Sequence, residues 1–149
     1  MTEKTILLVE DNSDDIMLIQ RLFERNRMIN GLDVVTDGEE ALDYLFGRGL
    51  YQDRDIRFQP ILILLDTRLP KLNGLEVLQH IRSRPETEDL PLIIMNNDKE
   101  EIKEIKGYEL DVKAFLAKPF SFAKFTKAAR KAGLHWLLTD APMTPEQGD

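Results

Sequence analysis

The chain has no cysteine among its 149 residues. This absence excludes disulfide bonds, thiol nucleophiles, iron–sulfur clusters and zinc sites built from cysteine. A protein without disulfides fits a reducing compartment. The chemistry of this chain therefore has to come from its other side chains.

Long hydrophobic runs are lacking as well. The longest unbroken apolar run is Ile61–Leu65, whereas a helix that spans a membrane needs about 20 apolar residues. The N-terminal sequence becomes acidic at Glu10 and Asp11, where a secretory signal peptide would stay apolar. We therefore expect a soluble, cytoplasmic protein with no membrane contact.

No basic block offsets the acidic residues. The chain has 20 Lys and Arg against 27 Asp and Glu, which gives a formal net charge of −7. Nucleic acid backbones repel such a charge unless a cluster of Lys and Arg compensates for it. We therefore expect no nucleic acid partner. The length and the 42% of hydrophobic residues predict a single domain with one sizeable core.

Short β-branched or leucine-rich runs alternate with amphipathic stretches along the chain. Strands covered on both faces are apolar throughout, and a helix packed on a sheet has one apolar stripe. The runs predict strands at Thr5–Val9, Leu32–Val35, Ile61–Leu65, Leu92–Met95 and Ala114–Leu116. The stretches predict helices at Ser13–Asn26, Glu39–Phe46, Leu75–Ser83, Lys99–Tyr108 and Phe120–Ala132. Strict alternation predicts a three-layer α/β domain around a parallel sheet.

Three local features refine this outline. Ser13 or Asp14 is expected to cap the first helix. Glycine, proline and mixed charge predict a long surface loop over residues 47–60. The fourth helix is highly charged, so its inner face is thin. That face is expected to consist of Ile102, Ile105 and Tyr108.

Charged side chains follow three of the apolar strands. Glu10 and Asp11 follow the first strand, Asp66 the third and Lys118 the fifth. The carboxyl ends of parallel strands meet at one edge of a sheet, so these groups should lie together. Carboxylates at such an edge repel each other unless a cation lies between them. Oxygen ligands without His or Cys favour a hard ion, so we expect Mg²⁺, with Mn²⁺ as the alternative.

Three segments resemble the signature sequences of a known family. They are ILLVEDN at residues 6–12, ILILLDTRLPKLNG at 61–74 and AKP at 117–119. In this order and at strand ends, they are similar to the bacterial response-regulator receiver domain. The resemblance implies a doubly wound (βα)5 flavodoxin-like receiver fold with strand order 2-1-3-4-5. It implies a receiver domain over residues 1–139 and a flexible, Pro-rich acidic tail over 140–149.

The resemblance also implies a role for each charged residue at the strand ends. Asp66 would be the phosphoacceptor that attacks a phosphohistidine of a sensor histidine kinase. Asp11, Asp66 and the main-chain carbonyl of Arg68 would hold Mg²⁺, and Glu10 would act largely through water. Lys118 would pair with the acyl phosphate. Signalling would then be non-enzymatic.

Four further positions complete the comparison with the family. Pro119 would follow a cis peptide bond that orients Lys118, and Phe115 occupies the place of the switch aromatic. Asn96 stands where the family has Ser or Thr, although its amide can still donate a hydrogen bond. Asn97 stands where a very small residue usually admits phosphodonors. These departures leave an alternative function open, a phosphorylation-independent interaction module with a receiver-like fold.

Two segments resemble a narrower group within this family. The GEEALDYLFGRG segment and the terminal HWLL are similar to single-domain regulators paired with phytochrome-type kinases, which implies a bacteriophytochrome partner. The large apolar residues Leu134, Trp136, Leu137 and Leu138 would form a homodimer surface or, alternatively, a lid on their own domain. With no room for an output domain, signalling would use protein contacts or a phosphorelay.

Arg68 and Asp98 flank the predicted site from opposite loops, and we hypothesise that they pair and restrict water access.

Overall fold

The computed structural model describes residues 5–134, which form one parallel sheet in the order β2-β1-β3-β4-β5 with helices on both faces. The strands are β1 (Ile6–Val9), β2 (Leu32–Val35), β3 (Leu62–Asp66), β4 (Leu92–Met95) and β5 (Ala114–Phe115). The helices are α1 (Ser13–Arg25), α2 (Gly38–Phe46), the 3₁₀ helix η1 (Gly49–Tyr51), α3 (Gly74–Arg82), α4 (Lys99–Gly107) and α5 (Phe122–Lys131). The predicted fold class and strand order are confirmed. The predicted tail over residues 140–149 lies outside the described residues.

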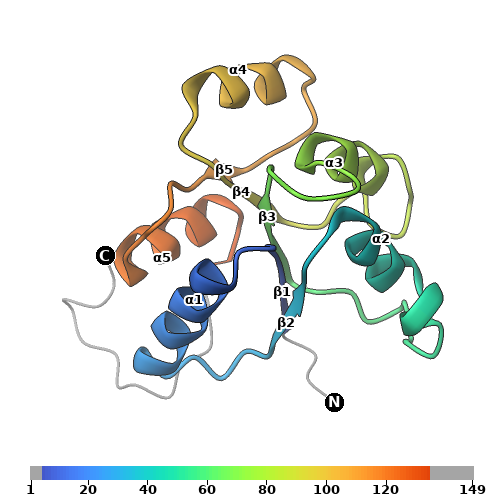
Figure 1. The fold of residues 1–149 in the computed structure, drawn as a ribbon, viewed down its shortest axis with the longest axis horizontal. Coiled ribbons are helices and arrows are strands. Elements are labelled where there is room, and N and C mark those ends of the chain that lie inside the picture. The colour runs from blue at the N-terminus through green and yellow to red at the C-terminus, as the bar shows by residue number, and fades with distance from the viewer. Residues whose placement is uncertain (1–4, 135–149) are drawn as a thin grey trace.

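The sheet separates two layers of helices, with α1 and α5 on one face and α2, α3 and α4 on the other (Figure 1). Alternation along each strand explains this arrangement, because successive side chains point to opposite faces. Ile6 and Leu8 of β1 pack in the core beneath α1 and α5. Leu7 and Val9 pack in the core beneath α2 and α3. No helix in the described part of the chain combines the length and apolar character that a membrane crossing requires.

The register of the central strands aligns their carboxyl ends. Val9 of β1 pairs with Leu65 of β3, and Asp66 pairs with Met95 of β4. Glu10 therefore emerges beside Asp66. The chain moves from β1 outward to β2 and then crosses to β3 on the other side, so these ends flank the switch point of the sheet.

The cap of α1 differs from the prediction. The Asn12 side chain accepts a hydrogen bond from the Asp15 amide at 3.0 Å, so neither Ser13 nor Asp14 is the capping residue. Asn12 keeps an extended backbone, whereas Ser13 is already the first helical residue. A cap must be the last non-helical residue before the first turn.

The inner face of α4 is thinner than predicted. Ile105 is buried and Ile102 is half-buried, but Tyr108 is 50% exposed. Tyr108 is the cap residue after Gly107, the last residue of α4, so it lies outside the helix whose inner face was predicted. The inclusion of Tyr108 in the inner face was therefore wrong.

The predicted loop over residues 47–60 is held in place by Arg54. Its Nε donates to the Tyr44 carbonyl oxygen at 2.7 Å, and its guanidinium lies 4.2 Å from the centre of the Tyr44 ring. A further hydrogen bond of 2.9 Å reaches the Gln59 side chain. This ordering, and the turn of η1 within the loop, depend on contacts distant in sequence and were not predicted.

Gly74 allows α3 to begin directly against the end of β3. A Cβ atom at this position would lie 2.4 Å from the Thr67 Cα atom and 2.9 Å from the Asp66 carbonyl oxygen. Both are backbone groups that cannot move aside without shifting the strand end. The Gly74 amide also donates to the Thr67 carbonyl at 2.9 Å.

We expect Gly74→Ala to lower the free energy of unfolding by about 1–3 kcal/mol, because an added methyl group would overpack against backbone. Urea unfolding of the purified protein measures the change. Gly107→Ala is the matched control, since a Cβ there would meet nothing within 4 Å. Equal effects of the two substitutions would contradict this account of Gly74.

Candidate functional site

A lysine at the carboxyl end of the sheet joins three carboxylates. The Lys118 ammonium donates to Glu10 Oε1 at 2.5 Å, to Asp15 Oδ2 at 2.9 Å and to Asp66 Oδ2 at 3.1 Å. Glu10 follows β1, Asp66 ends β3 and Lys118 follows β5. The predicted meeting of these three residues is confirmed.

Burial makes these charges strongly dependent on one another. Burial and a hydrogen bond with Asp66 raise the pKa of Glu10 from 4.5 to about 7, against the opposing effect of Lys118. Burial lowers the pKa of Lys118, but its hydrogen bonds to Glu10 and Asp15 and the charge of Asp66 outweigh burial and raise it overall. Lys118 therefore remains charged at neutral pH, and its one positive charge does not compensate for all the carboxylates.

Glu10, Asp11 and Asp66 form a cluster suited to a hard cation. Each offers a carboxylate oxygen, and these atoms lie within 4.8 Å of one another. Glu10 and Asp66 are buried, whereas Asp11 is exposed. The all-oxygen donor set and the raised pKa of Glu10 both indicate a place where a divalent ion would relieve repulsion.

Arg68 contacts the site through both its backbone and its side chain. Its amide donates to Asp66 Oδ1 at 3.1 Å, which orients the carboxylate. Its guanidinium pairs with Asp98 at 3.3 Å and lies 3.7 Å from a Glu101 oxygen. The hypothesised pairing of Arg68 with Asp98 is confirmed, while metal binding by the Arg68 carbonyl stays a prediction.

Asn96 uses its amide within the protein. Its Nδ2 donates to Thr67 Oγ1 at 2.6 Å, and its Oδ1 accepts from the Asp98 amide at 2.6 Å. Asn96 and Thr67 are both buried. Thr67 was not singled out from the sequence, although its place directly after Asp66, beyond the end of a buried strand, is a usable signal.

The remaining predicted residues surround the site at different distances. Asn97, Asn96 and Pro119 line a cavity of about 230 Å³ together with Asp66 and Lys118. The Lys118–Pro119 peptide bond is cis, as predicted.

Phe115 lies in a separate part of the structure, half-buried against the core beneath α2, α3 and α4. The ammonium of Lys106 lies 5.3 Å from the centre of its ring. Phe115 therefore contacts α4, and its role as a switch aromatic stays a prediction.

Asp15 is the functional candidate that the sequence interpretation missed. It lies in the first turn of α1 and lines the same 230 Å³ cavity as Asp66. Its place in the first turn of the helix that directly follows β1 is a signal that the sequence offered.

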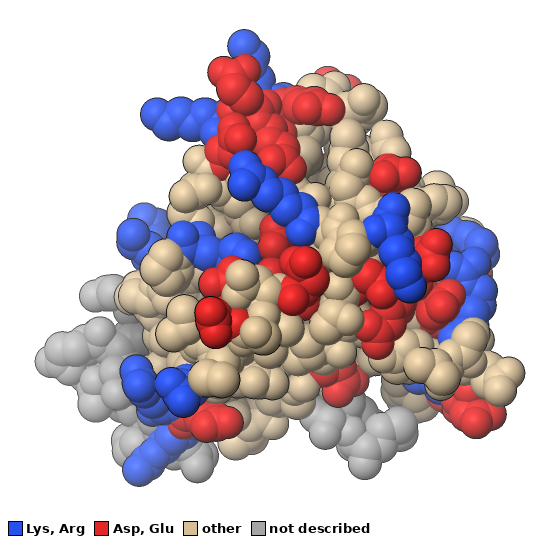
Figure 2. Space-filling model, viewed as in Figure 1, with Lys and Arg blue, Asp and Glu red and all other residues tan. Residues whose placement is uncertain are grey.

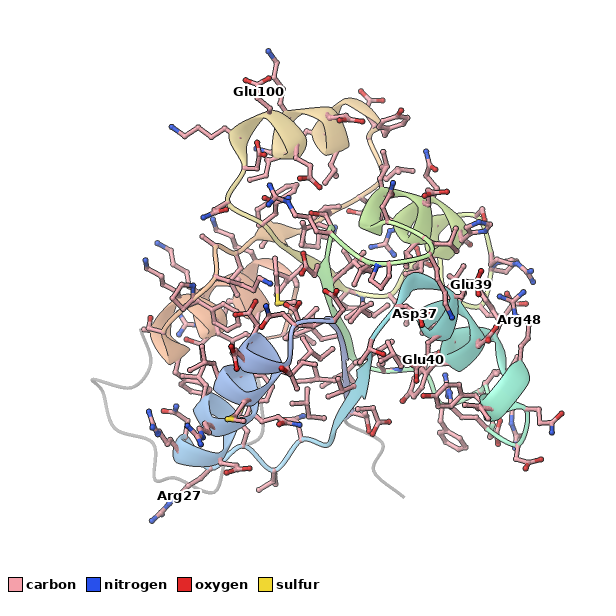
Figure 3. All side chains as sticks on the ribbon, in the orientation of Figure 1. Arg27, Asp37, Glu39, Glu40, Arg48 and Glu100 are labelled. Carbon is pink, nitrogen blue, oxygen red and sulfur yellow. The ribbon has the colours of Figure 1, made fainter. Side chains whose placement is uncertain are left out.

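Acidic side chains are visible in the middle of the molecular face that carries this site, with Lys and Arg side chains beside them (Figure 2). A second acidic group lies at the start of α2 and includes Asp37, Glu39 and Glu40 (Figure 3). Asp37 caps this helix and lies 3.5 Å from Lys71. Part of the net negative charge therefore belongs to a helix start outside the site.

This fold with clustered acidic groups and a lysine at its switch point defines a class of signalling domain. The profile of the response regulator receiver domain matches residues 6–130. The chain belongs to this family. Receiver domains are generally non-enzymatic signalling modules that bind a divalent metal, interact with sensor histidine kinases and are phosphorylated on an aspartate.

Particular relatives are single-domain regulators linked to phytochromes. Response regulator Rcp1 of Synechocystis sp. is 33% identical over 136 residues, covering 91% of this chain and 90% of that protein. The structure of the bacteriophytochrome response regulator AtBRR has a TM-score of 0.84 and 39% identity, covering 93% of this chain and 98% of that one. The phosphorylated cyanobacterial phytochrome response regulator RcpA has a TM-score of 0.70 and 34% identity, covering 93% and 96%.

We expect the metal-free protein to lose stability as the pH rises from about 5 to 7.5. The raised pKa of Glu10 means that the folded state holds a proton that the unfolded state releases at lower pH. The stabilisation is therefore complete below 4.5 and is lost as the pH rises through about 7. Urea unfolding in the presence of a chelator measures this dependence. The Glu10→Gln variant, which cannot ionise, should show a flatter curve over that range, and parallel curves would contradict the assignment.

Proposed function

We propose that the chain is a single-domain response regulator that accepts a phosphoryl group on Asp66 from a sensor histidine kinase. The observation that carries this proposal is the position of Asp66. It ends the central strand β3, lines an open cavity and lies 3.1 Å from the ammonium of Lys118. An acceptor needs a carboxylate that a phosphodonor can reach and a cation that stabilises the added charge.

The transfer forms a bond between an Asp66 oxygen and phosphorus. The bond between phosphorus and the kinase's imidazole nitrogen breaks, and its electron pair stays on the imidazole. The Arg68 amide holds one Asp66 oxygen, and Lys118 contacts the other. Lys118 would stabilise the negative charge that the phosphoryl oxygens bring, and the preorganised contacts spare the site from rearranging.

Mg²⁺ is the ion that we propose for the acidic cluster, with Mn²⁺ as an alternative. Asp11, Asp66 and the Arg68 carbonyl would hold it, and Glu10 would act through water. When bound, the ion supplies positive charge that offsets repulsion between the carboxylates and the incoming phosphoryl group. The close spacing of the acidic oxygens supports this assignment. The structure of the related Rcp1 is described as a Mn²⁺-bound form.

The loops around Asp66 would control access to the phosphorylated aspartate. Arg68 and Asp98 pair at 3.3 Å on opposite sides of the site, and we propose that this pair restricts the approach of water. Asn96 and Asn97 would govern entry of the phosphodonor, and Phe115 would respond as the switch aromatic. The hydrogen bond from Asn96 to Thr67 means that any switching at Asn96 requires that bond to break.

The biological setting of the proposal follows from the relatives. A bacteriophytochrome is the proposed kinase, because the names of related regulators refer to bacteriophytochromes and phytochromes. We propose a cytoplasmic receiver over residues 1–139 that signals through protein contacts or a phosphorelay. This domain would have no enzymatic output of its own.

Incubation with acetyl phosphate and Mg²⁺ tests the proposed acceptor. We expect intact-mass spectrometry to show an adduct of about 80 Da, the mass of HPO₃, because Asp66 is the nucleophile. The Asp66→Asn variant should show none, since its side chain is no longer a carboxylate. A chelator should also abolish the adduct in the wild-type protein.

A complete absence of the adduct, also with a cognate kinase, would overturn the proposal. It would favour the alternative of a phosphorylation-independent interaction module. The hydrogen bonds of Asn96 support that alternative, because its side-chain amide already binds Thr67 and the Asp98 backbone amide.

We further propose a homodimer that uses the apolar residues after α5. Leu134 is buried against the core beneath α1 and α5 and so packs on its own domain. The proposed surface therefore rests on Trp136, Leu137 and Leu138, which lie outside the described residues.

Light scattering tests the dimer. We expect the wild-type protein to have twice the mass of the chain and Trp136→Ala to shift it toward the monomer, because large aromatic side chains often dominate interfaces. An unchanged dimer in the variant would exclude Trp136 from the interface.

A further inference from the structure

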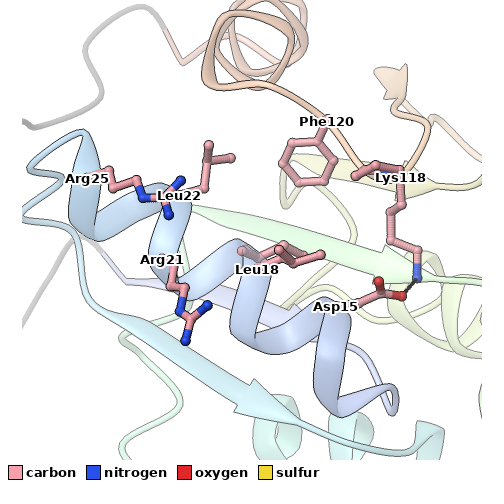
Figure 4. A pocket seen from close by; sticks show the side chains of 9 residues that line it. Asp15, Leu18, Arg21, Leu22, Arg25, Lys118 and Phe120 are labelled. Atoms are coloured by element: carbon pink, nitrogen blue, oxygen red, sulfur yellow. Dashed lines mark hydrogen bonds and ion pairs between the residues drawn. The ribbon is translucent and has the colours of Figure 1, made fainter.

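Asp15 places a third carboxylate on the ammonium of Lys118. The contact of 2.9 Å is shorter than the 3.1 Å contact between Lys118 and Asp66. Figure 4 shows Asp15 reaching from α1 toward Lys118, across the groove that also contains Leu18 and Phe120. The Asp15 side chain is 30% exposed, so water only partly screens its charge.

The contact matters because Asp15 and Asp66 share one nitrogen. Their bound oxygens therefore lie within about 6 Å of each other, a distance at which like charges repel measurably even in a partly aqueous setting. Asp15 also lines the cavity in which a phosphoryl group on Asp66 would lie. It is thus a negative charge beside the place where more negative charge arrives.

Resting on the proposed function, we infer that Asp15 is a positioning residue that competes with the phosphoryl group for Lys118 and slows phosphorylation by small anionic donors. Asp15 holds the ammonium toward α1 while Asp66 is unmodified. After transfer, the Lys118 ammonium also has to contact a phosphoryl oxygen. Asp15 then adds repulsion and draws part of the lysine charge away, so its carboxylate opposes the phosphorylated state.

The reaction that reveals this role is transfer from acetyl phosphate. An Asp66 oxygen forms a bond with phosphorus, the bond between phosphorus and the acetate oxygen breaks, and acetate leaves with the electron pair. No oxidant or reductant takes part. The donor is an anion that passes the mouth of the cavity, so a fixed negative charge there raises the barrier to its approach.

Asp15→Asn removes the charge and keeps an oxygen that can accept from Lys118. We expect its phosphorylation by acetyl phosphate and Mg²⁺ to be about 3- to 10-fold faster than that of the wild type at low ionic strength. The time course of the phosphorylated fraction in intact-mass spectrometry measures the rate. The advantage should shrink toward equality in about 0.5 M salt, because salt screens a partly exposed charge. A merely structural role for Asp15 would show no such salt dependence.

Two control variants test whether the contact between Asp15 and Lys118 is responsible for the change in rate. Asp14→Asn removes the same charge from the same exposed helix turn, but Asp14 is not among the partners of Lys118. Its rate should match that of the wild type. Asp15→Glu restores the charge and should return the rate toward the wild-type value.

The outcomes separate the inference from the proposed function. If the wild type is phosphorylated and Asp15→Asn is phosphorylated at the same rate or more slowly, the role of Asp15 is overturned. Asp66 then remains the acceptor. An equal acceleration in Asp14→Asn would also overturn it, because net charge alone would then explain the effect. A wild type that takes no phosphoryl group would instead overturn the proposed function, and the inference with it.

Discussion

The site depends on the interaction between one half-buried ammonium group and the carboxylates around it. Lys118 contacts Glu10, Asp15 and Asp66 within 3.1 Å. Without this cation, the three acidic groups at the carboxyl end of the sheet would repel one another with no compensating charge. Burial and the neighbouring Asp66 raise the pKa of Glu10 more than Lys118 lowers it, so a single positive charge does not compensate for these carboxylates. The same deficit of positive charge makes the cluster receptive to a divalent ion.

The parallel sheet is what makes this interaction possible. Its register places the ends of β1 and β3 side by side, and the crossover from β2 leaves those ends open rather than covered by a connection. Gly74 then lets α3 start against the backbone of Thr67, which helps to fix the position of Asp66. Backbone geometry therefore determines where the charged residues lie, and the contacts between their side chains complete the cluster.

Asp15 and Asn96 make additional hydrogen bonds around the site. These contacts adjust a site whose main residues are shared with the receiver family. Asn96 joins Thr67 to the start of α4 through its amide, because the Asp98 amide that it binds belongs to the residue that caps this helix. Asp15 links the site to the groove along α1. Rates of phosphorylation and switching would then be properties of this chain's own contacts, and belonging to the receiver family does not determine them.

The sequence by itself determined the layers, the strands and the residues at their ends. Apolar periodicity is a local property, and the order of parallel strands brings their ends to one edge whatever the loops do. Glu10, Asp66 and Lys118 could therefore be predicted. Tertiary structure decided which carboxylates Lys118 contacts. Asp15 and Lys118 lie 103 positions apart and meet only after α1 has packed on the sheet. It also decided the cap of α1 and the exposure of Tyr108, since both depend on where a helix begins or ends to within one residue.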